Sequence, residues 1–187
     1  MGGISIRLGV PKSFGETTFS IGHFSAKTLV ARETHFEEDI RRSLLTVHLS
    51  ASGDSGPSVD PKGKTTMLEA SPEPPDELPH WMTEEDLDYY VASYTESGFR
   101  GGLNWYRNIP YFLSDTAELE GKKISQPSIF ITGSEDPVRR MTGGRTGAEH
   151  FDDLRSVHVI EGPGHWVQIE AVDETNRLVL DFLKQFV

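Results

Sequence analysis

The stretch Gly-Pro-Gly-His-Trp-Val-Gln, residues 162–168, follows an apolar run at residues 157–160 and precedes a segment with helical spacing. Glycines before and after the proline let the backbone turn sharply and leave the imidazole of His165 exposed just beyond a strand. A histidine in that position is well placed to act as a catalytic base. The stretch therefore predicts a strand, a turn with a candidate base, and a helix from about 171 to 186.

A second strand-to-loop junction lies upstream, where Ile-Phe-Ile-Thr leads into Gly-Ser-Glu-Asp-Pro at residues 129–137. It places a carboxylate, Asp136, where the other junction places His165. One strand and a crossover segment fit between them, so both loops are predicted to open at the same edge of a parallel sheet. An acid that orients a histidine forms two thirds of a catalytic triad. Glu135 and Asp153 are rival candidates for the acid.

A nucleophile to complete the triad is not evident in the sequence. The segment Gly-Asp-Ser-Gly, residues 53–56, is similar to the nucleophile sequence of serine peptidases, with Ser55 as the candidate. The match is four residues long and lies in the Ser-, Gly- and Pro-rich segment 50–79, which we predict to be an irregular loop. A simple turn is the better interpretation. The chain contains no cysteine, so a thiol nucleophile and disulfides are excluded.

The composition limits the functions that the chain can have. It has 29 acidic and 18 basic residues and a formal net charge of −11, which argues against nucleic acid and anionic membrane surfaces as partners. The N-terminus lacks the form of a signal peptide, and no apolar run is long enough to span a bilayer. The histidines show no metal-ligand spacing, so we expect no metal and no cofactor. We expect a cytoplasmic protein.

The remaining periodicities predict an α/β fold, a parallel sheet with flanking helices. Strands are expected at 3–10, 128–133 and 156–160. Helices are expected at 36–49, from Thr83 as N-cap to a stop at Gly98, and at 103–107.

Two stretches then identify a family. Ser-Gly-Phe-Arg-Gly-Gly-Leu-Asn-Trp-Tyr-Arg-Asn, residues 97–108, resembles the cap-domain signature of the α/β-hydrolase-fold epoxide hydrolases. The preceding stretch, Trp-Met-Thr-Glu-Glu-Asp-Leu-Asp-Tyr-Tyr at residues 81–90, is similar to the segment before that signature. The loops of Asp136 and His165 resemble the acid and base loops of the family in order and spacing. The resemblance covers about residues 33–187.

The resemblance implies a mechanism and a set of site residues. In this family an aspartate opens an epoxide and forms an alkyl-enzyme ester, which a histidine-activated water hydrolyses to a vicinal diol. Cap tyrosines donate hydrogen bonds to the epoxide oxygen. By position, His165 is the base, Asp136 the orienting acid and Tyr106 one cap tyrosine. Trp105 and Trp166 are candidate contacts to a small apolar epoxide-type substrate.

Three features depart from the family pattern. The family's nucleophile elbow and its His-Gly-x-Pro loop do not occur, as if the chain began after that half of the fold. No tyrosine precedes Tyr89, and Ser20 stands where the other cap tyrosine is expected. The usual tryptophan is absent from residues 109–112. Because loss of a nucleophile costs about 10⁶-fold in triad enzymes, we expect this chain alone to be inactive or incomplete.

The predicted organisation is therefore an incomplete α/β-hydrolase fold with an inserted helical cap. Residues 1–11 would be a core strand, 12–115 the cap, and 116–187 the C-terminal part with the acid and base loops. Open sheet edges would allow self-association or pairing with a complementing chain. Two alternatives remain open: a non-catalytic binding or interaction protein derived from this fold, and another cap-bearing hydrolase such as a haloalkane dehalogenase.

Overall fold

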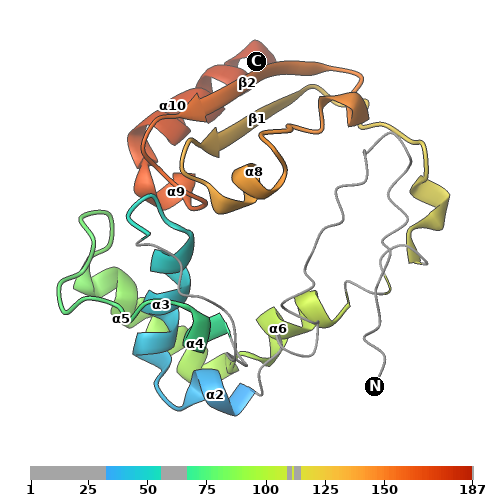
Figure 1. Cartoon of the computed structure of the whole chain (residues 1–187). Coiled ribbons are helices and arrows are strands. Elements are labelled where there is room, and N and C mark those ends of the chain that lie inside the picture. Colours follow the sequence, from blue (N-terminus) through green and yellow to red (C-terminus); the bar gives the residue numbers. More distant parts are fainter. Residues whose placement is uncertain (1–32, 56–66, 109–110, 112–114, 187) are drawn as a thin grey trace.

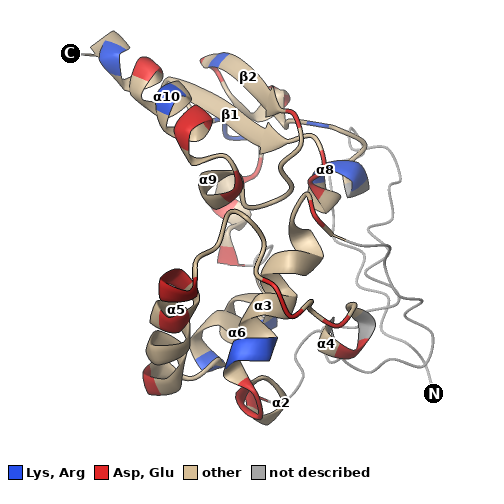
Figure 2. Cartoon of the chain, turned by 90° about the vertical axis from the view of Figure 1, so that its left-hand side faces the viewer, with Lys and Arg blue, Asp and Glu red and all other residues tan. Residues whose placement is uncertain are grey.

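The computed structural model describes residues 33–55, 67–108, 111 and 115–186. The predicted strand 3–10 and the position of Ser20 lie outside these residues. The described residues form two parts (Figure 1). One is helical and lies before residue 109; the other holds a parallel sheet and lies after residue 114. The C-terminal end of helix α3 (Ile40–Ala51) lies next to the part with the sheet, as Figure 2 also shows.

The sheet consists of two described strands, β1 (Ser128–Gly133) and β2 (Leu154–Ile160), which pair in parallel. An isolated parallel bridge between Ile124 and Phe151 extends the pairing before the strands. Both predicted strands are confirmed, and β2 begins two residues earlier than expected. The parallel arrangement places the loops that follow the two strands at one edge of the sheet.

Short helices follow each strand. β1 leads into α8 (Pro137–Met141), and β2 leads through the His165 turn into α9 (Val167–Glu170) and α10 (Val172–Leu183). A 3₁₀ turn at Ala148–His150 precedes β2, and another at Lys184–Phe186 ends the described chain. The predicted final helix is confirmed as α10, which ends earlier than residue 186. None of the described helices has the length and apolar character needed to cross a bilayer.

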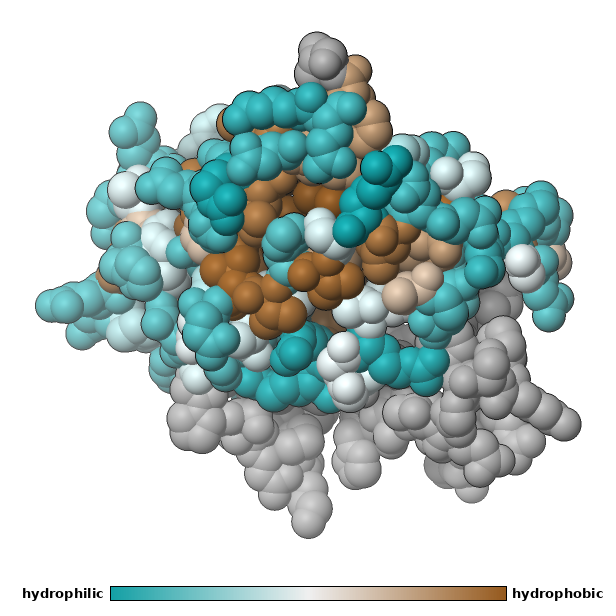
Figure 3. Space-filling model, turned by 90° about the horizontal axis from the view of Figure 1, so that it is seen from above, coloured by the Kyte–Doolittle hydropathy of each residue, from teal (hydrophilic) through white to brown (hydrophobic). Residues whose placement is uncertain are grey.

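Only one face of β2 is well covered. Its side chains alternate, and His158 lies near Glu174 of α10. Val157 and Val159 point to the opposite face and remain 43% and 42% exposed. Seen from above, the part of the molecule that holds the sheet shows an apolar area surrounded by hydrophilic residues (Figure 3).

The larger core lies in the helical part. It contains α2 (Glu33–Glu37), α3 (Ile40–Ala51), α4 (Met67–Ala70), α5 (Glu84–Ser97) and α6 (Arg100–Arg107), with a 3₁₀ turn at Ala117–Leu119 after it. α3 packs against α5. The buried apolar side chains of this core are Phe36, Leu44, Leu45, Leu68, Met82, Leu87, Phe99 and Leu103. Acidic residues gather at the start of α5 and on α10 (Figure 2).

The prediction of one helix over 36–49 is wrong, because the structure has α2 and α3 with a break at residues 38–39. Asp39 causes the break: its carboxylate accepts a hydrogen bond from the backbone N–H of Arg42 at 2.9 Å and caps α3. An aspartate side chain competes well for free N–H groups at a helix start. The hydrophobic periodicity continues across the break and conceals it.

The prediction that segment 50–79 is an irregular loop is wrong at residues 67–70, which form α4. Leu68 on α4 is 2% exposed, and Leu78 packs against the same core. Isolated leucines among polar residues produce no periodicity that a sequence can reveal.

The α5 prediction is confirmed in detail. Thr83 and Asp86 form a reciprocal capping box, and Gly98 ends the helix with φ at 66°. α6 begins at Arg100, three residues before the predicted start at Leu103. Gly101 and Gly102 have low helix propensity and conceal its first turn.

Candidate active site

Asp136 lies directly after β1 and is only 9% exposed. Its carboxylate accepts a hydrogen bond from the backbone N–H of Val138 at 2.7 Å and thereby caps α8. The hydroxyl of Thr132, the last residue but one of β1, donates to the other oxygen at 3.3 Å. These two donors fix the carboxylate in one orientation.

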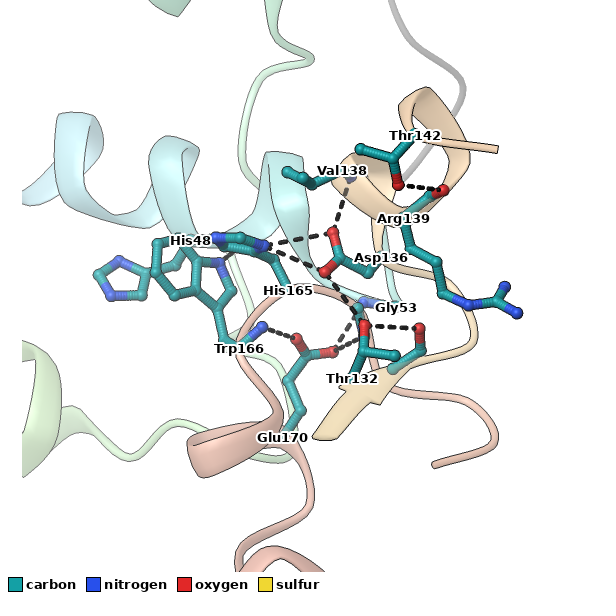
Figure 4. A network of polar contacts seen from close by, with 12 residues as sticks. His48, Gly53, Thr132, Asp136, Val138, Arg139, Thr142, His165, Trp166 and Glu170 are labelled. Carbon is teal, nitrogen blue, oxygen red and sulfur yellow. Dashed lines mark hydrogen bonds and ion pairs between the residues drawn. The ribbon is translucent and has the colours of Figure 1, made fainter. Parts of the chain in front are cut away.

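His165 lies on the turn after β2 and faces this carboxylate (Figure 4). Its Nδ1 is 3.2 Å from both carboxylate oxygens of Asp136. The two residues come from loops that follow neighbouring parallel strands. The prediction that the two loops open at one edge of the sheet is therefore confirmed. Because an ionised carboxylate is only an acceptor, Nδ1 carries the proton in this pair.

The two rival acids have other partners. Glu135 accepts a hydrogen bond from Nη1 of Arg140 at 2.9 Å, and Asp153 accepts one from Nε of Arg155 at 2.6 Å. Among the three candidates in the described part of the chain, only Asp136 forms a hydrogen bond with His165.

The pair has the chemistry of a base and its orienting acid. With Nδ1 bound to Asp136, the Nε2 of His165 is the nitrogen left to take a proton from water. The side chain of His165 is 41% exposed, whereas that of Asp136 is 12% exposed. The imidazole is thus open to a reactant, and the acid behind it is shielded.

Trp166 lies beside His165 and braces it against α3. The two rings meet edge to face, with centroids 4.9 Å apart. The indole Nε1 donates to the backbone carbonyl of His48 at 2.9 Å. The indole also packs against the imidazole of His48, with the two ring centroids 5.2 Å apart. The structure thus places Trp166 next to the candidate base; contact with substrate remains a prediction.

Tyr106 and Trp105 lie elsewhere. Both are on α6, and their side chains are 47% and 68% exposed. α6 lies at a distance from the loops after β1 and β2 (Figure 1). The hydrogen bonds of the described residues include none between Tyr106 and either His165 or Asp136. The structure therefore joins two of the predicted site residues, places Trp166 beside them, and leaves Tyr106 and Trp105 apart.

Two further residues, His48 and Glu170, lie around the site, and the sequence did not predict a role for either. Burial lowers the pKa of His48, although its Nδ1 contacts the carbonyl of Leu44 at 2.8 Å. Glu170 accepts hydrogen bonds from the backbone around His165. Neither residue belongs to a local motif, because their partners are distant or are backbone groups. Within the described ranges, no group of three or more His, Asp or Glu is arranged to hold a metal ion.

Solved structures define the class of the fold. Epoxide hydrolase A from Mycobacterium thermoresistibile matches with a TM-score of 0.72 and 31% identity, over 87% of this chain and 51% of that one. An epoxide hydrolase from an endophytic Streptomyces matches with a TM-score of 0.73 and 33% identity, over 81% of this chain and 48% of that one. The chain thus has part of an α/β-hydrolase fold.

Curated relatives give the family. Epoxide hydrolase A of Mycobacterium tuberculosis is 36% identical over 172 residues, which are 91% of this chain and 53% of the relative. Epoxide hydrolase 1 of Siraitia grosvenorii is 37% identical over 139 residues, 71% of this chain and 43% of the relative. No family model matches the chain. The chain is a homologue of the epoxide hydrolases and spans about half the length of the curated relatives it matches.

Proposed function

We propose that this chain carries the base and acid of an epoxide hydrolase and acts in the step that releases a vicinal diol from an alkyl-enzyme ester. The observation that carries the proposal is the 3.2 Å contact between Nδ1 of His165 and the carboxylate of Asp136. It occurs in a chain whose relatives are named epoxide hydrolases. These relatives favour this family over the haloalkane dehalogenases.

In the proposed step, Nε2 of His165 takes a proton from water as the water oxygen bonds to the ester carbonyl carbon. The imidazolium that forms is stabilised by the Asp136 carboxylate. The tetrahedral intermediate then breaks its bond to the diol oxygen, and the imidazolium returns the proton to that oxygen. The products are the diol and a carboxylic acid, which releases its proton to solvent to become a carboxylate, and His165 is neutral again.

We also propose that the helical part, within residues 12–115, is the cap over this site. Its α6 would carry Tyr106 as the phenol that donates a hydrogen bond to the epoxide oxygen, with Trp105 as a substrate contact. The exposed phenol of Tyr106 supports this role, because it is open to a ligand. Residues 116–187 would be the C-terminal part of the hydrolase domain, and the substrate a small apolar epoxide.

The attacking carboxylate is not among the residues that we assign, since no elbow motif occurs in the 187 residues. The test therefore adds it. The purified chain is mixed with the separately expressed N-terminal half of Epoxide hydrolase A of Mycobacterium tuberculosis, and diol formation from styrene oxide is measured. We expect diol formation in the mixture and its loss when the chain carries His165→Gln. The chain alone should form no more diol than the His165→Gln variant alone.

One result would contradict the proposed role of His165, and another would contradict the expectation that the chain lacks the nucleophile. The first is diol formation in the mixture that His165→Gln leaves unchanged, which would remove His165 from the reaction. The second is turnover by the chain alone that His165→Gln abolishes, which would mean that this chain also contains the nucleophile. Intact mass measured after incubation with the epoxide shows which protein carries the ester.

A second candidate function is an interaction protein that self-associates, or pairs with a complementing chain, through its sheet. Exposed apolar side chains favour it: Val157 and Val159 on β2, with Leu180 and Leu183 on α10 at 55% and 50% exposure. A two-stranded sheet with an uncovered apolar face can gain pairing and burial from another chain.

A further inference from the structure

The carboxylate of Glu170, at the end of α9, accepts three backbone hydrogen bonds from two distant parts of the chain (Figure 4). Oε1 accepts from the N–H of Trp166 at 3.0 Å. Oε2 accepts from the N–H of Gly164 at 2.9 Å and from that of Gly53 at 2.7 Å. Gly164 and Trp166 flank His165, whereas Gly53 follows α3. One carboxylate therefore joins the His165 turn to the end of α3.

The two backbones that Glu170 joins are in direct contact. The N–H of His165 itself donates to the carbonyl of Ala51, the last residue of α3, at 2.7 Å. A Cβ on Gly53 would collide with the carbonyl oxygen of Gly162, and one on Gly164 would collide with that of Ala51. The His165 turn therefore fits against α3 only because glycines stand at the points of closest approach.

The charge of Glu170 suits this position. Two of its three donors, Gly53 and Gly164, converge on one oxygen, and hydrogen bonds to a charged acceptor are stronger than those between neutral groups. A glutamine would keep one acceptor oxygen and direct an NH₂ group at backbone N–H donors. No arrangement of that amide satisfies all three donors.

We propose that Glu170 is a positioning residue for His165. It acts through the turn: by holding Gly164 and Trp166 it fixes the backbone on both sides of the imidazole, and by holding Gly53 it sets the turn against α3. The imidazole is thereby kept toward Asp136, and its position is coupled to the helical part. The inference rests on the proposed function in so far as His165 is the base.

The test compares Glu170→Gln with Glu161→Gln, which makes the same charge change at an exposed carboxylate just before the same turn. Amide hydrogen exchange is measured by NMR on the whole chain. We expect about tenfold faster exchange at Gly53, Gly164 and Trp166 in Glu170→Gln, the size typical of a lost hydrogen bond to a charged group. We expect no change in Glu161→Gln or at the amides that pair β1 with β2.

His165 supplies the decisive readouts, because its backbone N–H and its imidazole are hydrogen-bonded to Ala51 and Asp136 and not to Glu170. In Glu170→Gln its amide should also exchange faster, and the low-field signal of its Nδ1 proton, hydrogen-bonded to Asp136, should broaden or disappear. Unchanged His165 signals would overturn the proposal. Equal loss of protection across β1 and β2 would overturn it too, since Glu170 would then serve general stability. These readouts require no turnover, so a negative diol assay would count against the proposed function alone.

Discussion

At the scale of single residues, His48 stands out because it is a titratable group enclosed by aromatic rings. Its imidazole packs against the rings of both Tyr90 and Trp166, with ring centroids 5.3 and 5.2 Å away. Burial lowers its pKa and outweighs the opposing effect of the hydrogen bond to Leu44. Since Trp166 lies against His165, the protonation state of His48 bears on the surroundings of the candidate base.

The lowered pKa of His48 predicts a pH-dependent stability. The folded chain binds fewer protons at His48 than the unfolded chain, in which the imidazole has a pKa of about 6.5. The contribution to stability is present above that pH and is lost as pH falls through the window down to the lowered pKa. His48→Asn keeps a side-chain donor and removes the titration. Between pH 7 and 5, urea unfolding should show a smaller loss of unfolding free energy in this variant than in the wild type. The same dependence of the unfolding free energy on pH in both proteins would contradict the prediction.

The site also shows what a single residue contributes through geometry. Asp136, Glu135 and Asp153 are equivalent as carboxylates in the sequence. The structure separates them, because two bind arginines and the third faces His165. The strand-to-loop junction predicted the place of the acid, and the arginine partners of the rivals became visible only in the fold.

At the scale of elements, α5 shows how local sequence determines a helix. The hydroxyl of Thr83 accepts the N–H of Asp86 at 3.1 Å, and the Asp86 carboxylate accepts the N–H of Thr83 at 3.0 Å. The hydrogen bonds from Thr83 lower the pKa of Asp86. Both residues lie within one turn, so the sequence alone was sufficient to predict the start of this helix.

Removing the N-cap side chain of α5 should destabilise the helical part. Thr83→Ala leaves the backbone N–H of Asp86 without its side-chain acceptor, and the free energy of unfolding should fall by about 1 kcal/mol. Thr95→Ala is the matched control, because Thr95 lies within α5 and its hydroxyl donates only to the carbonyl of Val91 four residues earlier. Urea titration followed by far-UV circular dichroism measures both. Equal losses of unfolding free energy in the two variants would contradict the role of Thr83 as the N-cap of α5.

At the scale of the whole molecule, two parts of different character meet at the end of α3. The helical part holds most of the buried apolar side chains, whereas the part with the sheet leaves many of its apolar side chains exposed. The contact between them includes backbone groups around Gly53 and Gly164, the carboxylate of Glu170, and the indole of Trp166 against His48. The position of the candidate base therefore depends on both parts.

The exposed face of β2 predicts association between chains. Burying a valine side chain contributes about 1.5 kcal/mol, and a lysine on a strand opposes pairing, so Val159→Lys should weaken association at least about tenfold. Tyr89→Lys is the control, since Tyr89 is 73% exposed on α5, away from the sheet. Sedimentation velocity over a range of concentrations compares the three proteins. A wild-type chain that sediments as a monomer at every concentration would exclude self-association through this face.

The sequence by itself determined the strands 128–133 and 156–160, the helix after Thr83, and the common edge at which Asp136 and His165 meet. Each of these depends on neighbouring residues or on the general geometry of parallel strands. Only the tertiary structure decided the break at Asp39, the burial of Leu68 and the hydrogen bonds of Glu170 across the chain. These depend on contacts between residues far apart in sequence, and such contacts leave no periodic pattern.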